Sequence, residues 1–451
     1  MPSLSLSMIV RDAETMLPAC LESARNLVDE MVIADTGSKD GTLEVARRYG
    51  ARCLSIPWEN DFARARNRAL AEVRSDWVLV LDADEQLDAE AGRLIPPLLE
   101  HPEIEGFKVT IRNYVTSLNH RIWDWPARIN DTPLEAARRF PAYIDHENVR
   151  LFRRRPHICF VGRVHETVGP QIIRTGGGLG KADFRIHHFG LAVDAETRLR
   201  KNRQYRQLGQ QKVQEMPDNA QAHFELGLVV FDSFHDDQEA LKSFALACRL
   251  NPRLGVAWLF RGLALQRLGH HSEALTSFAN AASICGPNAL ATEAEGDSHY
   301  SLGDFDSARR CYKRALASTG EAPAIKSKIG LAEVRAGRTR AGLRRLRRAV
   351  EEAPKLAEVH DRLIQACVWL NLLDEAAAAA DRKLAAVDPD PPSFLRAASI
   401  HAQMLNWEKA GEILRSGLHQ FPKVERLRRF LVEVEAAQAA PGADRCSGNP
   451  S

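Results

Sequence analysis

An acidic pair follows an apolar run within the first hundred residues of the chain. The segment VLVLDADEQLD, residues 78–88, sets Asp82 and Asp84 one residue apart directly after a strand-like stretch. In a turn, two such carboxylates can converge on one divalent cation, and Mg²⁺ or Mn²⁺ prefers a few carboxylates combined with phosphate oxygens. Asp84 as a plain helix cap is the alternative, because aspartate often takes that position. The pair is therefore a candidate site for Mn²⁺ or Mg²⁺.

Two further polar segments have residue types suited to a nucleotide. DTGSKDGT, residues 35–42, contains two glycines that allow a tight turn, and Asp35 is placed to accept hydrogen bonds from a ribose or a uracil N–H. No Gly-Lys-Ser/Thr follows, which excludes a Walker-type phosphate loop. Farther on, Arg66 and Asn67 occupy the first turns of an expected helix and could contact a base and a phosphate. A solvated basic helix face explains that second pair equally well.

The elements that must position these residues alternate between strand and helix. Such alternation predicts a mostly parallel sheet covered on both faces, and ligands of such sheets bind at the carboxyl ends of the strands. We expect strands at 4–10, 30–34, 52–56 and 77–81, and helices at 15–26, 43–49 and 62–72.

Taken in order, four segments resemble the family-2 glycosyltransferases of the GT-A fold. The resemblance covers residues 4–193 and implies a Rossmann-like α/β domain that uses a nucleoside-diphosphate sugar, with UDP as the nucleotide. It also implies that Asp35 binds the base, that Arg66 and Asn67 help to fix it, and that Asp82 and Asp84 hold ribose, diphosphate and metal. The matching segments are SMIVRDAE at 7–14, VIADTGSKDGT at 32–42, FARARNRAL at 62–70 and WVLVLDADE at 77–85. The family more often has Lys-Asn where this chain has Arg11-Asp12.

The segment NVRLFRRRPHICFVGRVHETV, residues 148–168, is similar to one branch of that family. This branch includes lipopolysaccharide-core glucosyltransferases and the peptide glycosyltransferases of glycocin clusters. The Glu-Asp pair that supplies the general base in many other members is missing. Glu166, in Val164-His165-Glu166, is the candidate replacement, with Asp145 and Asp183 in reserve; a surface His-Glu pair is the alternative.

The segment RIHHFG, residues 185–190, carries the last candidate. The resemblance implies a late histidine near the metal and the diphosphate, and His188 fits that position better than His187. Imidazole is a suitable ligand for Mn²⁺, although a purely structural histidine is the alternative. The implied reaction is a single displacement with inversion, in which the cation on Asp84 stabilises the leaving diphosphate and a carboxylate deprotonates the acceptor.

Beyond residue 218 the pattern changes to a period of about 34 residues, which resembles tetratricopeptide repeats. Small residues, alanines, bulky residues and prolines recur in step, and they predict about six repeats. The markers are Gly227, Gly262, Gly296 and Gly330; Ala240, Ala274, Ala308, Gly342, Ala376 and Ala410; Phe244, Phe278, Tyr312 and Leu346; and Pro252, Pro287, Pro354 and Pro422. The predicted domains are a catalytic domain at 1–193, a linking helix at 194–217, repeats at 218–426, a capping helix at 427–440 and a disordered tail at 441–451.

Composition limits the other possibilities. A formal net charge of +2 on 451 residues gives no global field for nucleic acid. Eight scattered cysteines without a CxxC pair favour a reducing compartment. The sequence contains no stretch of about 18 apolar residues, so it predicts no transmembrane segment. We expect a cytoplasmic protein, with peripheral association at the inner membrane face left open.

The repeats predict a partner-binding surface. The acceptor of the sugar is a peptide or protein, a glycan or a lipid-linked molecule, and a protein partner could bind the concave face. An arginine cluster at 335–348 favours an acidic acceptor, an acidic partner or self-association as a homodimer, whereas a solvated helix face is the bland alternative.

Two rival functions differ in class. A catalytically degenerate scaffold, whose repeats bind proteins, is the first. Nucleotidyl transfer is the second, and it is rejected because Arg11-Asp12-Ala13-Glu14 is not a glycine-rich, lysine-containing loop. The donor sugar and the acceptor cannot be deduced from these residues.

Overall fold

The computed structural model describes residues 2–116, 121–122, 125–164, 166–190, 195–320, 322–387 and 389–439. These form two compact units, Met1–Glu239 and Ala240–Ser451. The division falls inside the predicted first repeat, so the expected domain boundary at 218 stays a prediction. His165 of the Val-His-Glu segment and the predicted tail at 441–451 lie outside the described residues.

The first unit is built on a mixed sheet whose first half is parallel. Its strands run in the order β3-β2-β1-β4, and every pair between neighbours is parallel. This half confirms the predicted α/β fold. The strands are β1 (Leu4–Val10), β2 (Glu30–Asp35), β3 (Arg52–Ser55) and β4 (Trp77–Val80).

Helices cover both faces of this parallel half, because the buried strands alternate apolar side chains between two cores. Leu6 and Met8 of β1 pack in one core with Leu17 of α1 (Leu17–Ala24). The same core includes residues of α2 (Thr42–Arg48). On the other face Val78 and Val80 of β4 pack with Ala63 of α3 (Phe62–Ala71). The carboxyl ends of β2 and β4 therefore emerge between the helical layers at one edge of the sheet.

The second half of the sheet adds antiparallel pairs that the sequence did not predict. Beyond β4 the order continues β10-β6-β11-β5, in which β10 is antiparallel to both β4 and β6, β11 is parallel to β6, and β5 is antiparallel to β11. These elements are β5 (Glu85–Leu87), α4 (Ala91–Leu99), β6 (Ile104–Val115), β10 (Ala142–Arg153), α5 (Gly169–Arg174) and β11 (Gly178–His188). Smaller pieces are β7 (Arg121–Ile122), β8 (Trp125–Pro126), β9 (Arg128–Ile129) and a 3₁₀ turn at Glu135–Ala137.

Two helices complete the first unit. A long helix, α6 (Ala195–Glu215), packs against α7 (Ala220–Val229), which continues into a π-helical turn at Val230–Phe234. The ion pair between Lys212 Nζ and Glu225 Oε2, at 2.5 Å, joins α6 to α7, and both side chains are largely buried.

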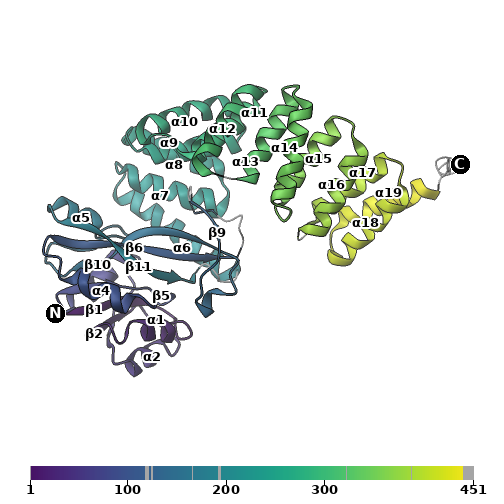
Figure 1. Ribbon diagram of the computed structural model, residues 1–451. Coiled ribbons are helices and arrows are strands. Elements are labelled where there is room, and N and C mark those ends of the chain that lie inside the picture. The colour runs from purple at the N-terminus through teal and green to yellow at the C-terminus, as the bar shows by residue number, and fades with distance from the viewer. Residues whose placement is uncertain are drawn as a thin grey trace. The chain divides into compact units, whose positions relative to one another are not determined.

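The second unit is an all-helical stack. After α8, helices α9 to α18 pack as five successive hairpins among the described residues, and α19 packs on the last hairpin (Figure 1). This arrangement confirms the predicted tetratricopeptide-like solenoid. The helices are α8 (Asp237–Leu250), α9 (Gly255–Arg267), α10 (His271–Cys285), α11 (Ala289–Ser301), α12 (Phe305–Thr319), α13 (Pro323–Arg335), α14 (Thr339–Glu352), α15 (Ala357–Trp369), α16 (Leu373–Ala386), α17 (Pro391–Gln403), α18 (Trp407–Gln420) and α19 (Glu425–Ala439).

The periodic small and bulky residues meet each other inside the hairpins. A Cβ atom added at Gly262 would lie 2.5 Å from the Phe278 ring, and one added at Gly296 would lie 2.6 Å from the Tyr312 ring. The two helices of a hairpin can therefore approach closely only where the first has no side chain. This contact explains why glycine and a bulky residue recur together.

The predicted arginine cluster is mostly paired within the second unit. Arg338 contacts Asp306, Arg345 contacts Glu333, Arg347 makes two hydrogen bonds to Glu375, and Arg348 contacts Glu352. For much of the cluster, these contacts support the alternative of a solvated helix face over that of a binding surface. Seven cysteines are free in the described part of the chain, and no helix there is long and apolar enough to span a membrane.

Candidate active site

Asp82 lies just beyond the carboxyl end of β4 and is held by two arginines. Its Oδ1 atom accepts a hydrogen bond from Arg66 Nη2 at 2.6 Å, and its Oδ2 atom accepts one from Arg150 Nη2 at 3.3 Å. Arg66 comes from α3, and Arg150 comes from β10, the strand that pairs with β4. Both guanidinium groups therefore converge on the strand end where the sequence predicts a nucleotide site.

Arg66 also bridges Asp82 to the candidate general base. Arg66 Nε donates a hydrogen bond to Glu166 Oε1 at 2.6 Å. The Arg66 side chain is 8% exposed and that of Glu166 is 12% exposed. Arg66 Nη1 is buried, and it has no hydrogen-bond partner among the described residues. Since a buried donor without a partner is costly, this third nitrogen is a natural contact for an anionic ligand.

Glu85 completes the charged cluster, and the sequence reasoning did not single it out. Its Oε1 atom accepts a hydrogen bond from Arg150 Nη2 at 2.8 Å, and its Oε2 atom accepts one from the Asp82 backbone N–H at 2.9 Å. Burial raises the pKa of Glu85 to about 7. Burial acts the same way on Asp82, but the charges of Arg66 and Arg150 outweigh it and hold the pKa of Asp82 well below its usual range. The two arginines thus keep Asp82 ionised, while burial disfavours a charge on Glu85.

Asp84 and His188 face each other beside this cluster. His188 Nε2 lies 3.4 Å from Asp84 Oδ2, and His188 Nδ1 lies 2.7 Å from Asn113 Oδ1. Burial lowers the pKa of His188, but the Asp84 carboxylate outweighs that effect, and the pKa is raised. A carboxylate and an imidazole nitrogen suit Mn²⁺. The two predicted metal ligands therefore form a donor pair that fits such an ion.

Gly190 makes room for that pair. A Cβ atom at this position would overlap Asp84 Oδ2 and would lie 2.6 Å from His188 Nε2. The neighbouring histidine has another role, because His187 Nδ1 lies 2.8 Å from the Tyr114 hydroxyl and its ring is buried. Of the two histidines, only His188 contacts Asp84 among the described residues.

Asp35 and Asn67 are occupied by local contacts. The Asp35 carboxylate accepts hydrogen bonds from the backbone N–H groups of Gly37 and Ser38, so it shapes its own turn. The Asn67 amide donates to the Phe160 carbonyl at 2.9 Å and accepts from the Phe160 N–H at 2.8 Å. The contacts recorded in the described residues do not join either side chain to the charged cluster.

The reserve candidates for the base lie elsewhere in the sheet. Arg112 holds Asp145 through two hydrogen bonds of 2.9 Å, and its guanidinium group stacks 3.6 Å from the centre of the Tyr143 ring. Asp183 is exposed on β11. Glu166 is the one of the three candidates that contacts the charged cluster within the described ranges.

Tyr205 brings the predicted linking helix to the site. This tyrosine is on α6, and its ring centre lies 6.1 Å from that of Phe62, the first residue of α3. Burial, followed by the negative charges of Glu166, Asp82 and Asp84, raises the pKa of Tyr205 to about 12. The phenol therefore stays protonated near these carboxylates. The sequence contained no signal for this, because α6 reads as a simple connection.

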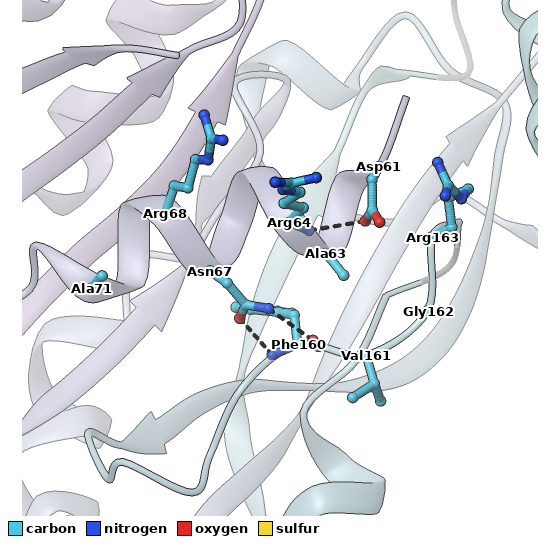
Figure 2. A pocket seen from close by; sticks show the side chains of 10 residues that line it. All are labelled: Asp61, Ala63, Arg64, Asn67, Arg68, Ala71, Phe160, Val161, Gly162 and Arg163. Atoms are coloured by element: carbon cyan, nitrogen blue, oxygen red, sulfur yellow. Dashed lines mark hydrogen bonds between the residues drawn. The ribbon is translucent and has the colours of Figure 1, made fainter. Parts of the chain in front are cut away.

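A cleft of about 610 Å³ lies on another side of α3. Figure 2 shows Asn67 hydrogen-bonded to Phe160 there. It also shows the Asp61 carboxylate, which caps α3 by accepting a hydrogen bond from the Arg64 backbone N–H. Arg64, Asn67 and Arg68 line this cleft, whereas Arg66 is absent from its lining, as the helical spacing of 3.6 residues per turn requires. The cleft is therefore distinct from the charged cluster.

Comparison with known proteins places the first part of this chain among glycosyltransferases. The sequence profile described as glycosyl transferase family 2 matches residues 5–160. A TPR repeat-containing protein of Synechococcus elongatus is 36% identical over 38% of this chain and 37% of that protein. The lipopolysaccharide core biosynthesis glycosyltransferase LpsC of Rhizobium meliloti is 30% identical over 45% of this chain and 69% of LpsC. The SPbeta prophage-derived glycosyltransferase SunS of Bacillus subtilis is 21% identical over 37% of this chain and 34% of SunS.

Proposed function

The chain belongs to glycosyl transferase family 2, and from that premise we propose that it transfers a sugar from a UDP-sugar to an acceptor, with a divalent cation and with inversion. The observation that carries the proposal is the joint placement of the Asp84–His188 pair and the Arg66–Asp82–Glu166 bridge at the end of β4. The names of LpsC and SunS, as glycosyltransferases, support the same activity.

Stabilisation of the leaving group is the main demand on this site. Asp84 and His188 would hold Mn²⁺ or Mg²⁺, which would neutralise the charge that develops on the departing diphosphate. Arg66 and Arg150 add fixed positive charge at the same place, and the unpartnered Arg66 Nη1 can donate to a phosphate oxygen. Asp82, kept ionised by those arginines, would contact the ribose.

Glu166 is the proposed general base. Its ion pair with Arg66 keeps the carboxylate oriented, and no hydrogen bond from the described residues reaches its Oε2 atom. An acceptor hydroxyl that donates to this oxygen could lose its proton to Glu166 as the new glycosidic bond forms. One displacement from the face opposite the diphosphate inverts the anomeric carbon.

The nucleotide contacts are proposed with different roles for Asp35 and Asn67. Asp35 ends β2 at the same sheet edge as Asp82, so the base is proposed to lie against its turn. The two hydrogen bonds between Asn67 and Phe160 favour a positioning role for Asn67, which fixes the segment at 160–163 against α3.

The repeats are proposed to bind the acceptor or a protein partner, within the domain boundaries given above. The acceptor class stays open among peptide or protein, glycan and lipid-linked molecules. Homodimer formation and peripheral membrane association also remain proposals.

An intact-mass screen tests the transfer itself. The full-length protein is incubated with Mn²⁺, with a panel of UDP-sugars, and with peptide, glycan and lipid-linked acceptors. The proposal predicts a mass increase of one sugar on an acceptor together with release of UDP. If no donor gives UDP release and no acceptor gains mass, the result favours the scaffold function instead.

A further inference from the structure

Three side chains of metal-binding type meet in the second unit, far along the sequence from the proposed active site. Glu295 and His299 lie on α11, and Cys311 lies on α12. One potential ligand atom from each residue, a carboxylate oxygen, a ring nitrogen and the sulfur, lies within 4.8 Å of the other two. Such mutual distances are short enough for one ion to contact all three after small side-chain rotations.

The fold of the hairpin explains how these residues come together. Glu295 and His299 are four residues apart, so they project from the same face of α11. Gly296 lets α12 approach that face, since a Cβ atom there would lie 3.2 Å from Cys311 Cβ. The close approach that defines the repeat thus also places the thiol beside the carboxylate and the imidazole.

A second carboxylate lies beside the histidine. His299 Nδ1 lies 3.4 Å from Asp304 Oδ2, and Asp304 caps α12. When a carboxylate accepts a hydrogen bond from one ring nitrogen of a histidine, the other ring nitrogen can bind a metal, and metal-binding histidines usually have such a partner. The cluster therefore has, in addition to three possible ligands, a carboxylate beside the histidine, as metal sites usually do.

We propose that Glu295, His299 and Cys311 bind one Zn²⁺ ion, with water as the fourth ligand. A thiolate, an imidazole and a carboxylate are the ligands that zinc takes in proteins. Mg²⁺ is disfavoured because it avoids sulfur. The ion would join α11 to α12 and stabilise this repeat. The zinc site is separate from the Asp84–His188 pair, so failure of one proposal leaves the other untouched.

One existing contact and one proton compete with the ion. Arg314 Nη1 lies 3.6 Å from Glu295 Oε2, and that side chain must release the carboxylate or share it. Cys311 is 4% exposed and must lose its proton to bind zinc as the thiolate. Arg314 is itself 59% exposed, so it can turn into solvent when zinc binds.

Zinc content and cobalt absorption test the site in the full-length protein. The protein is stripped with a chelator, re-loaded with Zn²⁺, dialysed and measured by plasma mass spectrometry. Wild type should retain a zinc ion that Cys311→Ser and His299→Ala lose. Cys248→Ser is the matched control, because Cys248 is 3% exposed and lies in the same helical unit, and it should retain the ion.

Cobalt separates this site from the proposed active site. Co²⁺ bound to a thiolate gives a charge-transfer band in the near ultraviolet, and Asp84 and His188 offer no sulfur. The band should appear in wild type, in Cys248→Ser and in Asp84→Asn, and should vanish in Cys311→Ser. Absence of the band in wild type, or equal zinc content in all variants, would overturn the proposal. Circular dichroism of Cys311→Ser checks that the loss does not come from unfolding.

Discussion

Arg66 Nε donates a hydrogen bond of 2.6 Å to Glu166 Oε1, and this bond joins two residues that are 100 positions apart in the sequence. The same guanidinium group holds Asp82 at 2.6 Å. One buried arginine therefore ties the proposed base to the proposed nucleotide site. Both sides of the reaction depend on its position.

Glu166→Gln should lower the transfer rate strongly and leave UDP-sugar affinity nearly unchanged. Glutamine keeps the carbonyl oxygen that can accept the Arg66 Nε–H, but it cannot take a proton from the acceptor. Steady-state kinetics, with donor affinity measured by calorimetry, check this. Asp145→Asn is the comparison variant. A weakened donor affinity with normal turnover in Glu166→Gln would instead place Glu166 in the nucleotide site.

Asp84→Asn should reduce transfer by about 10²–10³-fold, the usual cost of losing a key electrostatic stabiliser. The fold should persist, because the side chain contacts His188 at a partly open site and is not part of the apolar core. Asp183→Asn, an exposed change on β11, serves as the control. Near-normal turnover of Asp84→Asn at saturating Mn²⁺ would contradict the metal assignment.

Gly190→Ala should impair activity because the added methyl group displaces the side chains of Asp84 and His188. The new methyl group would overlap Asp84 Oδ2, so that carboxylate must move away from His188. We expect a lower transfer rate and a higher Mn²⁺ concentration at half-maximal activity. Gly92→Ala in α4 is the matched control, because a Cβ atom added at Gly92 would have no other atom within 4 Å. Unchanged Mn²⁺ dependence in Gly190→Ala would argue against the donor pair.

Gly262→Ala should destabilise the repeats by about 1–3 kcal/mol, the typical cost of overpacking a core. The added Cβ would lie 2.5 Å from the Phe278 ring inside the α9–α10 hairpin. Chemical denaturation followed by circular dichroism measures the free energy of unfolding. A stability equal to that of wild type would show that the hairpin can separate at no cost, contrary to the close contact that we infer.

Removal of the second unit should separate two activities. A chain ending at Glu239 keeps α6, α7 and the buried Lys212–Glu225 pair. It should still hydrolyse UDP-sugar slowly, while transfer to the native acceptor should be lost. A chain ending at 217 would lack α7 and should unfold at a lower temperature. Efficient glycosylation of the acceptor by the chain ending at Glu239 would exclude the repeats after that residue as an acceptor platform.

The sequence predicted what depends on local pattern. The strand that leads to Asp82 is a continuous apolar run. The repeats are evident from the period of about 34 residues with which the small residue at Gly262 and the bulky residue at Phe278 recur. The predictions did not include contacts made by tertiary folding alone. Arg150 contacts Asp82 although the two are 68 residues apart in the sequence. Tyr205 lies near enough to the carboxylates for their charges to raise its pKa, and it comes from a helix that the sequence presents as a linker. Glu85 could have been noticed as a third acid beside Asp84, but its burial depends on the antiparallel half of the sheet.

Metal dependence of transfer tests the central claim most directly. The enzyme is stripped with a chelator, and UDP release from the accepted UDP-sugar is measured with its acceptor while Mn²⁺ is added back. Wild type should regain activity as Mn²⁺ rises, whereas Asp84→Asn and His188→Ala should stay far below wild-type activity over the same range, Asp84→Asn by about 10²–10³-fold. Full activity of the stripped enzyme without Mn²⁺, or equal recovery in Asp84→Asn, would contradict the account.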